Sequence, residues 1–255
     1  MSALEANKRR AQALGLHGLA DRWNEVAGKD WVPELLALEE EYRHRSGLAR
    51  RLRGANLGDF KPLADFDWNW PHEIDREAIE ELMTLAFLDE KENIVFFGNN
   101  GTGKTLIAKN IGLEAVRRGR RVLFTDASEM LTQLSRAETQ GVIGKALSRL
   151  AKLDLLVIDE IGQVTFSARH ADLLFAVINR RYLKKSTILT TNTPFAQWGD
   201  LFPSATCVHA LVDRLMHRGE KVEIKGPSFR QRESEERQQR KHTRRATRKG
   251  RPKEP

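Results

Sequence analysis

Residues 98–105 bring together the residue types that bind the phosphates of a nucleotide. This segment holds three glycines followed by a lysine and a threonine, between a short apolar run at residues 94–97 and a helix-forming stretch at residues 106–118. Strand, glycine-rich loop and helix in this order predict a P-loop. The glycines let successive backbone N–H groups face one anion, and the helix adds the positive end of its dipole.

Two side chains of this loop have specific expected roles. Lys104 is expected to reach the β- and γ-phosphates of ATP, and the Thr105 hydroxyl is expected to ligate Mg²⁺. A glycine-rich turn that matches by chance is the alternative, but the strand, the loop, the Lys-Thr pair and the helix are all in place. We therefore expect ATP to be bound by Gly98, Asn99, Asn100, Gly101, Thr102, Gly103, Lys104 and Thr105.

Three further polar residues follow apolar runs. Asp159 and Glu160 come directly after residues 155–158, and Asn192 follows residues 187–191. Asp159 is expected to hold Mg²⁺, and Glu160 to orient and deprotonate a water that attacks the γ-phosphate. Asn192 could position that water. A charged strand end is the alternative for Asp159 and Glu160, but because a kinase benefits from excluding a water-activating carboxylate, Glu160 beside a P-loop favours hydrolysis.

The stretches between these residues alternate between strand and helix patterns. Strands are predicted at residues 121–125, 155–158, 187–191 and 221–224, and helices at residues 128–137, 142–151, 168–183, 196–202 and 208–217. This alternation predicts an α/β fold, with a parallel sheet covered by helices on both faces. Ligands bind such sheets at the carboxyl ends of the strands, where Gly98, Asp159 and Asn192 are all expected.

The composition predicts four segments. Residues 1–53 predict a small all-helical domain, with apolar residues at helical spacing over 14–26 and a second helix that begins near Asp30. Residues 54–74 predict a linker, whose aromatic rings are expected to pack onto the following domain or, alternatively, to stack on a base or contact adenine. Residues 75–230 are predicted to form the ATPase core, whose residues 75–88 have a helical pattern. Residues 231–255 are predicted to be a disordered basic tail.

The net charge of +8 is concentrated at the C-terminus, because residues 230–255 hold eleven Lys or Arg against four Glu. A basic tail indicates nucleic-acid binding, or else a solvated end without a partner. The arginines before the linker also have two interpretations. They could contact phosphates, or they could simply stabilise the negative end of a helix dipole at its C-terminus. These are Arg43, Arg45, Arg50, Arg51 and Arg53.

Composition also bears on the compartment. No apolar run approaches the ~20 residues that a membrane-spanning helix needs. Cys207 is the only cysteine, so the chain forms no internal disulfide and no cysteine-based metal site. Both features favour a cytoplasmic protein without membrane contact.

The motifs together resemble those of AAA+ ATPases of the initiator and helicase-loader clade. Residues 98–105, 155–162 and 186–192 are similar to the Walker A, Walker B and sensor 1 motifs of that clade. Residues 193–202, Thr-Pro-Phe-Ala-Gln-Trp-Gly-Asp-Leu-Phe, resemble the IstB family, the ATPase helpers of a class of bacterial insertion sequence. Residues 16–20, 63–67, 211–215 and 226–230 add to this resemblance, which extends to about Arg232.

The resemblance implies roles for four more residues. Arg214 would be an arginine finger that reaches the γ-phosphate of a neighbouring subunit, with an intramolecular salt bridge as the alternative. Arg230 would be the sensor 2 arginine. Residues 128–151 occupy the place of an insertion that lines a DNA channel in related assemblies, so Lys145 and Arg149 could meet phosphates or simply form a solvated helix face.

For the whole protein, the resemblance implies an ATPase that uses ATP and Mg²⁺ and binds double-stranded DNA. It would assemble as a homo-oligomeric ring or spiral and recruit or activate a transposase. A DnaC-like loader of a replicative helicase is an alternative with the same core. An architectural DNA-binding module, whose ATP site only stabilises assembly, is a second alternative.

Overall fold

The computed structural model describes residues 2–71, 73–162 and 165–249, with only the backbone described over residues 242–249. The chain forms two compact units, Met1–Arg53 and Gly54–Pro255. Within the described residues, no helix is both long and apolar enough to cross a membrane.

The first unit is all-helical. It contains α1 (Ala3–Ala13), α2 (His17–Asp21), α3 (Trp23–Val26) and most of α4 (Trp31–Ala55). Its small core is formed by Ala11, Leu14, Trp23, Val32 and Leu36. An ion pair of 2.7 Å between Arg10 and Glu40 joins α1 to α4. The helical spacing over residues 14–26 corresponds to two short helices, which follow a left-handed turn at Gly15 with a φ of 63°.

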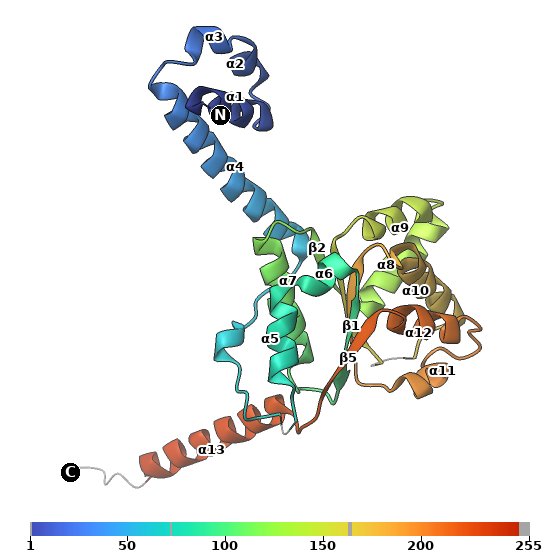
Figure 1. Cartoon of the computed structure of the whole chain (residues 1–255). Helices are drawn as coiled ribbons and strands as arrows, with labels where there is room; N and C mark the ends of the chain where they lie inside the picture. Colours follow the sequence, from blue (N-terminus) through green and yellow to red (C-terminus); the bar gives the residue numbers. More distant parts are fainter. Residues whose placement is uncertain (1, 72, 163–164, 250–255) are drawn as a thin grey trace, which may run out of the picture. The chain divides into compact units, whose positions relative to one another are not determined.

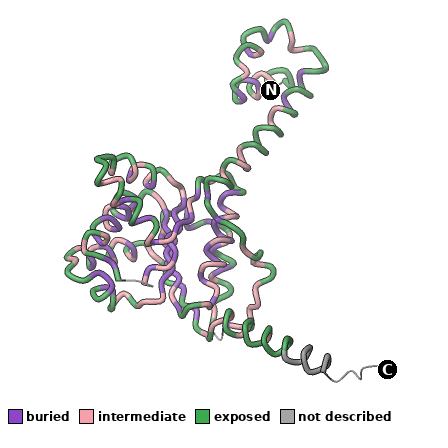
Figure 2. Tube along the Cα trace, turned by 180° about the vertical axis from the view of Figure 1, so that it is seen from behind, coloured by how far each residue is buried: buried purple, intermediate pink, exposed green. Residues whose placement is uncertain are grey.

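The second unit is built on a five-stranded parallel sheet with the order β2-β3-β4-β1-β5. The strands are β1 (Asn93–Gly98), β2 (Val122–Asp126), β3 (Leu155–Ile161), β4 (Ser186–Thr191) and β5 (Gly219–Ile224). Every residue of β4 is buried, as expected for a strand covered on both faces. Figure 2 shows buried residues concentrated along the sheet and the helices beside it. The predicted parallel α/β architecture is confirmed.

Helices cover both faces of this sheet (Figure 1). On one face lie α7 (Lys104–Arg117) and α5 (Arg76–Thr84), and on the other a group of helices that share a large apolar core with β3. That group contains α8 (Ala127–Thr139), α9 (Ile143–Ala151), α10 (Ala168–Arg181), α11 (Trp198–Leu201) and α12 (Val208–Met216). Short 3-10 turns occur at η1 (Leu63–Asp65) and η2 (Phe195–Gln197).

The helix expected over residues 75–88 is in fact two helices. α5 ends at Thr84, Leu85 adopts a left-handed conformation with a φ of 68°, and α6 (Ala86–Glu90) follows. The Arg118 guanidinium donates hydrogen bonds to the carbonyls of Thr84 and Met83. These bonds satisfy carbonyls that a helix end leaves without partners, so a distant residue stabilises the break.

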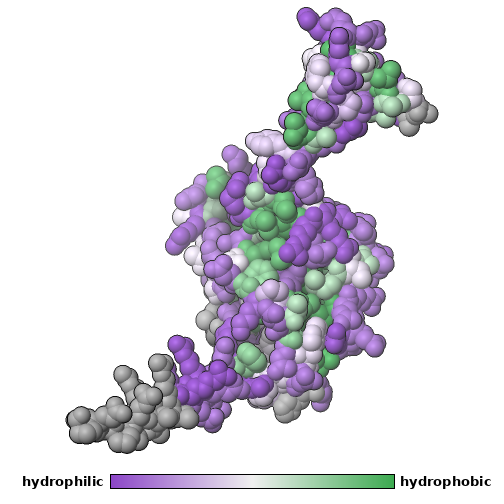
Figure 3. Space-filling model, turned by 90° about the vertical axis from the view of Figure 1, so that its left-hand side faces the viewer, coloured by the Kyte–Doolittle hydropathy of each residue, from purple (hydrophilic) through white to green (hydrophobic). Residues whose placement is uncertain are grey.

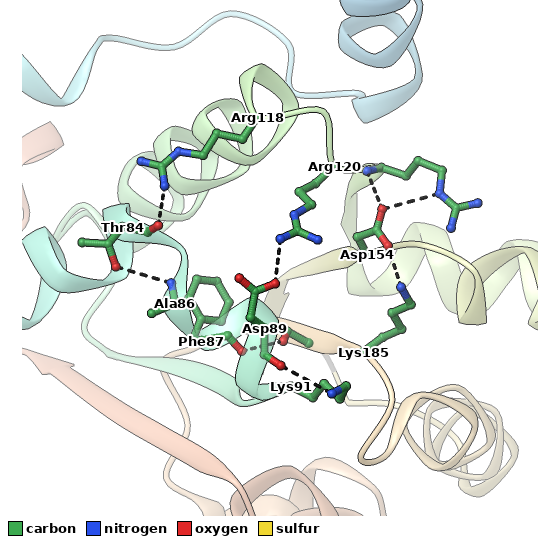
Figure 4. A network of polar contacts seen from close by, with 11 residues as sticks. Thr84, Ala86, Phe87, Asp89, Lys91, Arg118, Arg120, Asp154 and Lys185 are labelled. Atoms are coloured by element: carbon green, nitrogen blue, oxygen red, sulfur yellow. Dashed lines mark hydrogen bonds and ion pairs between the residues drawn. The ribbon is translucent and has the colours of Figure 1, made fainter. Parts of the chain in front are cut away.

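A polar network lies at the amino ends of the strands, on the edge of the sheet opposite the carboxyl ends (Figure 4). Asp154, just before β3, accepts a hydrogen bond of 2.6 Å from Lys185 and one of 2.9 Å from the Arg121 N–H. Burial opposes ionisation of Asp154, but these donors outweigh it and hold the pKa of Asp154 below its ordinary value. Arg120 pairs with Asp89 in the same network. The network as a whole joins the segments just before β2, β3 and β4 to α6.

The C-terminal segment corrects an expectation. Residues 231–249 were expected to be a disordered tail, but they continue helix α13 (Phe229–Lys249). The segment 229–249 contains no Gly or Pro and consists largely of Arg, Glu, Gln and Lys, which favour helices. An i,i+4 pair between Arg232 and Glu236 supports its first turns. The last part of the expected tail, residues 250–255, lies outside the described residues.

Candidate nucleotide-binding site

The loop between β1 and α7 takes the conformation that its glycines permit. Gly101 and Gly103 have φ values of 79° and 102°, in the left-handed region that glycine adopts without strain. Neither position has room for a side chain, because a Cβ would lie 2.2 Å from the Ser228 Oγ at Gly101 and 2.6 Å from the Phe66 ring at Gly103. The loop is therefore enclosed by the linker on one side and by the start of α13 on the other.

Lys104 is the first residue of α7 and is only 8% exposed. Its Nζ donates to the carbonyl oxygens of Gly98, at 2.8 Å, and Asn99, at 2.7 Å. Burial lowers the pKa of Lys104; the charges of Asp159 and Glu160 oppose this shift. The ammonium group thus lies inside the loop, where α7 directs its N-terminal N–H groups.

Asp159 and Thr105 meet across the sheet at its carboxyl edge. The Thr105 hydroxyl donates to Asp159 Oδ1 at 3.1 Å, and the Thr190 hydroxyl donates to the same oxygen. Burial raises the pKa of Asp159, which is 5% exposed, and both hydroxyl donors oppose that shift. A carboxylate beside a hydroxyl is a hard oxygen donor pair, as Mg²⁺ prefers when substrate phosphates complete its coordination. Within the described residues, no cluster of three acidic, His or Cys side chains could hold a metal alone.

Glu160 and Asn192 lie at the ends of neighbouring strands. Glu160 has a φ of 63°, and its N–H donates to the Thr190 Oγ1 at 2.9 Å. The Asn192 amide donates to Asn100 Oδ1 of the P-loop at 3.3 Å. A carboxylate and an amide therefore border the region beside the loop that would hold the γ-phosphate.

Most of these residues border one cavity of about 550 Å³, although Gly98, Asn99 and Asp159 do not line it. Lys104, Thr105, Glu160, Asn192 and Arg230 all line it, as do parts of the linker and the start of α13. Arg230 is otherwise exposed, and its charge contributes to lowering the pKa of Lys104. The predicted loop, strand-end and sensor 2 residues are thus brought together, although their roles stay predictions.

Arg214 is not brought into this cavity. It lies on α12, half-buried, with its guanidinium 4.6 Å from the centre of the Phe175 ring and 5.9 Å from that of Tyr182. Its one hydrogen bond to a described group reaches the Ala210 carbonyl at 3.4 Å. Among the described side chains, no salt bridge to Arg214 is found, so the structure gives no support to the alternative of an intramolecular ion pair.

Lys145 and Arg149 lie elsewhere, on α9. Both border a second cavity of about 340 Å³ between β2, α8 and α9, which is lined mostly by apolar residues. The two cations are one helical turn apart on α9, and both border this second cavity. Phosphate contacts and a solvated helix face both stay predictions for this pair.

The linker contributes more to the site than the sequence indicates. Phe66 packs against Gly103, and the Asn110 side chain on α7 fixes the linker by accepting from the Leu63 N–H and donating to the Lys61 carbonyl. Three of its aromatic rings, Phe60, Phe66 and Trp70, line the cavity, so contact with a base or adenine stays a prediction. The linker also contacts α13, because Arg232 lies 3.3 Å from Asp67 and stacks on Trp70. Aromatic residues in a linker were the only sequence signal for this arrangement.

Comparisons with known proteins find both a family and individual relatives. Residues 9–237 match the model of a family described as IstB-like ATP-binding protein. The chain is 38% identical over 200 residues to an ATP-binding protein of insertion sequence IS21 from Pseudomonas aeruginosa, covering 78% of this chain and 76% of that protein. It is 34% identical over 229 residues to an ATP-binding protein of insertion sequence IS5376 from Geobacillus stearothermophilus, covering 86% and 91%.

Two solved structures are similar in fold. The DnaC helicase loader aligns with a TM-score of 0.52 and 22% identity over 69% of this chain and 99% of that chain. AMPPCP-bound DnaA from Aquifex aeolicus aligns with a TM-score of 0.56 and 23% identity over 67% and 51%. At these identities the similarity shows the fold alone, which is that of the AAA+ proteins. The match over most of the chain, together with relatives of this identity and coverage, shows that the protein belongs to the family of IstB-like ATP-binding proteins.

Proposed function

We propose that this protein is a Mg²⁺-dependent AAA+ ATPase that assembles on double-stranded DNA and recruits or activates a transposase. The observation that carries the proposal is the Thr105–Asp159 contact at the carboxyl edge of the sheet, with Glu160 next in the chain and lining the same cavity. A hydroxyl and a carboxylate that can hold Mg²⁺, beside a second carboxylate that can activate water, suit hydrolysis of a nucleoside triphosphate.

Each residue has a role in this proposal. Lys104 moves from the loop carbonyls to the β- and γ-phosphates. Thr105 and Asp159 hold Mg²⁺, which neutralises charge on the phosphates when it is bound. Glu160 takes the proton of the attacking water while Asn192 orients that water. Arg214 acts on the γ-phosphate of a neighbouring subunit, which accounts for its distance from the cavity of its own chain.

The insertion-sequence relatives support the transposition context, because their names place ATP-binding proteins of this kind in insertion sequences. DNA binding is supported by a structure of the initiator DnaA bound to AMPPCP and single-stranded DNA, which is 26% identical with a TM-score of 0.50.

A helicase loader would share the fold. The identity of the captured partner separates the two functions: a pull-down with the full chain and ATP should capture a transposase, and capture of a replicative helicase would favour the alternative.

The basic helix α13 is the surface that we propose for non-specific contact with DNA phosphates. After Phe229, its described side chains are hydrophilic (Figure 3), and they include Arg237, Arg240 and Lys241. Arg232, one of two basic residues near the start of the helix, is held by Asp67 and Glu236. Because phosphate contacts position a protein without reading bases, this helix should contribute affinity rather than sequence preference.

A salt titration tests this surface. Changing Arg237, Arg240 and Lys241 together to Gln should flatten the log–log dependence of DNA affinity on salt by about 0.9 for each phosphate that the protein no longer neutralises. Truncation after Arg232 should flatten it further, because it removes all the basic residues of the segment except Arg230 and Arg232. ATP binding should survive in both. A matched control changes three cations near the opposite edge of the sheet, Lys91, Arg120 and Lys184, and should give a line parallel to the wild type. If all variants gave lines parallel to the wild type, the DNA contacts would have to lie outside α13.

A further inference from the structure

The two acidic residues of the site lie in an irregular part of the sheet. The β3–β4 pairing runs through Ile158 opposite Leu189 and resumes with Ile161 opposite Thr191. Asp159 and Glu160 therefore both face a single residue, Thr190, which makes this a β-bulge. The bulge strains the backbone of Glu160, because its φ of 63° is uncommon for a residue with a side chain.

One hydroxyl holds both residues of this bulge. The Thr190 Oγ1 accepts the Glu160 N–H at 2.9 Å, and the Thr190 O–H donates to Asp159 Oδ1. A hydroxyl has one proton to donate and lone pairs to accept, so both bonds form at once. Thr190 is 1% exposed, and its β-branched side chain has restricted rotation. The orientation of this hydroxyl is thus fixed by packing rather than by solvent.

We propose that Thr190 is a positioning residue for ATP hydrolysis, whose hydroxyl holds the Asp159–Glu160 bulge so that the Glu160 carboxylate faces the phosphate cavity. The inference rests on the hydrolytic function proposed above. Thr190 borders the cavity, and its hydroxyl bonds Asp159 and Glu160. Its hydroxyl holds the main chain of Glu160 and one carboxylate oxygen of Asp159.

Three variants separate positioning from mere packing. Thr190→Val keeps the shape and removes the hydroxyl, whereas Thr190→Ser keeps the hydroxyl. The matched control is Thr125→Val on β2, which borders β3 on its other side. Thr125 is 6% exposed, and its hydroxyl donates to the main-chain oxygen of Asp126 at 3.2 Å. All three proteins are compared by thermal melting, so that any loss of folding is measured directly.

The Thr190→Val substitution should affect kcat much more than KM. Thr190→Val should lower kcat on the order of 10- to 100-fold, the scale of one lost hydrogen bond to a charged group. KM for ATP should change far less, because the P-loop is intact. Thr190→Ser should recover most of the turnover, and Thr125→Val should stay near wild type. A Thr190→Val protein with wild-type kcat, or one no worse than Thr125→Val, would overturn the role of Thr190.

A readout without ATP tests the contact itself. In nucleotide-free protein, hydrogen exchange at the Glu160 amide should be faster in Thr190→Val than in wild type or Thr190→Ser, because its acceptor is gone. Unchanged exchange at this amide would overturn the inference. A wild-type protein that binds ATP but releases no phosphate, with or without DNA, would instead overturn the proposed hydrolysis. The two failures are therefore distinguishable.

Discussion

Replacing Glu160 with Gln should leave ATP binding close to the wild-type level and reduce hydrolysis by about 10²- to 10⁴-fold, the usual contribution of a general base. The variant keeps the Thr105–Asp159 pair and the Glu160 N–H bond to Thr190, so the site keeps its shape. It removes only the carboxylate that would accept the proton. The protein should therefore accumulate in an ATP-bound, assembled state.

Lys104→Ala is the matched variant with the opposite expectation. Lys104 is buried within the loop and bonds the Gly98 and Asn99 carbonyls, so its loss should remove ATP binding and, with it, assembly. Binding of a fluorescent ATP analogue and release of phosphate are measured on both proteins, with melting curves as a check on folding. Equal loss of nucleotide binding in the two variants would contradict the roles given to both residues.

Arg214→Ala should still bind ATP as a monomer and should lose hydrolysis by on the order of 10³-fold or more, as other arginine fingers do. The reason is that the residue lies outside the cavity of its own chain and would act across an interface. Its truncation also removes the stacking on Phe175 and Tyr182. A melting curve therefore accompanies the assay, and Arg214→Lys serves as a variant that keeps a cation.

Mixing two inactive proteins tests action between subunits. Arg214→Ala and Glu160→Gln proteins should together recover part of the turnover, because some interfaces then combine an intact Glu160 with an intact Arg214. Neither protein should recover turnover when mixed with more of itself. An inactive mixture that nevertheless assembles on DNA would argue that Arg214 acts within its own chain or not at all in hydrolysis.

The sequence predicted the parts of the fold that local patterns encode. Apolar runs at residues 94–97 and 155–158 became β1 and β3, and the glycine-rich loop lies between a strand and a helix, with positive φ values at its glycines. The parallel topology then placed Gly98, Asp159 and Asn192 at one edge of the sheet. Such inferences succeed because strand periodicity and the rule for ligand sites depend on residue type and chain order alone.

What the sequence missed depends on contacts between distant residues. The helix break at Leu85 is stabilised by Arg118, and the geometry of Glu160 depends on Thr190 in another strand. Neither partner can be identified before the sheet register is known. α13 differs for another reason. A run of like charges is also typical of disorder, and the contact that fixes the start of this helix, from the Phe229 N–H to the Gly101 carbonyl of the P-loop, joins residues far apart in the chain.

The most direct measurement counts subunits on a DNA duplex by mass photometry, using the Glu160→Gln protein with ATP, with ADP and without nucleotide. The proposed function predicts multi-subunit complexes on DNA with ATP, few with ADP, and none for Lys104→Ala under any condition. The wild type should form the same complexes and lose them as ATP is consumed. Complexes of equal size with and without nucleotide, formed equally by Lys104→Ala, would contradict an ATP-driven assembly and favour an architectural DNA-binding protein.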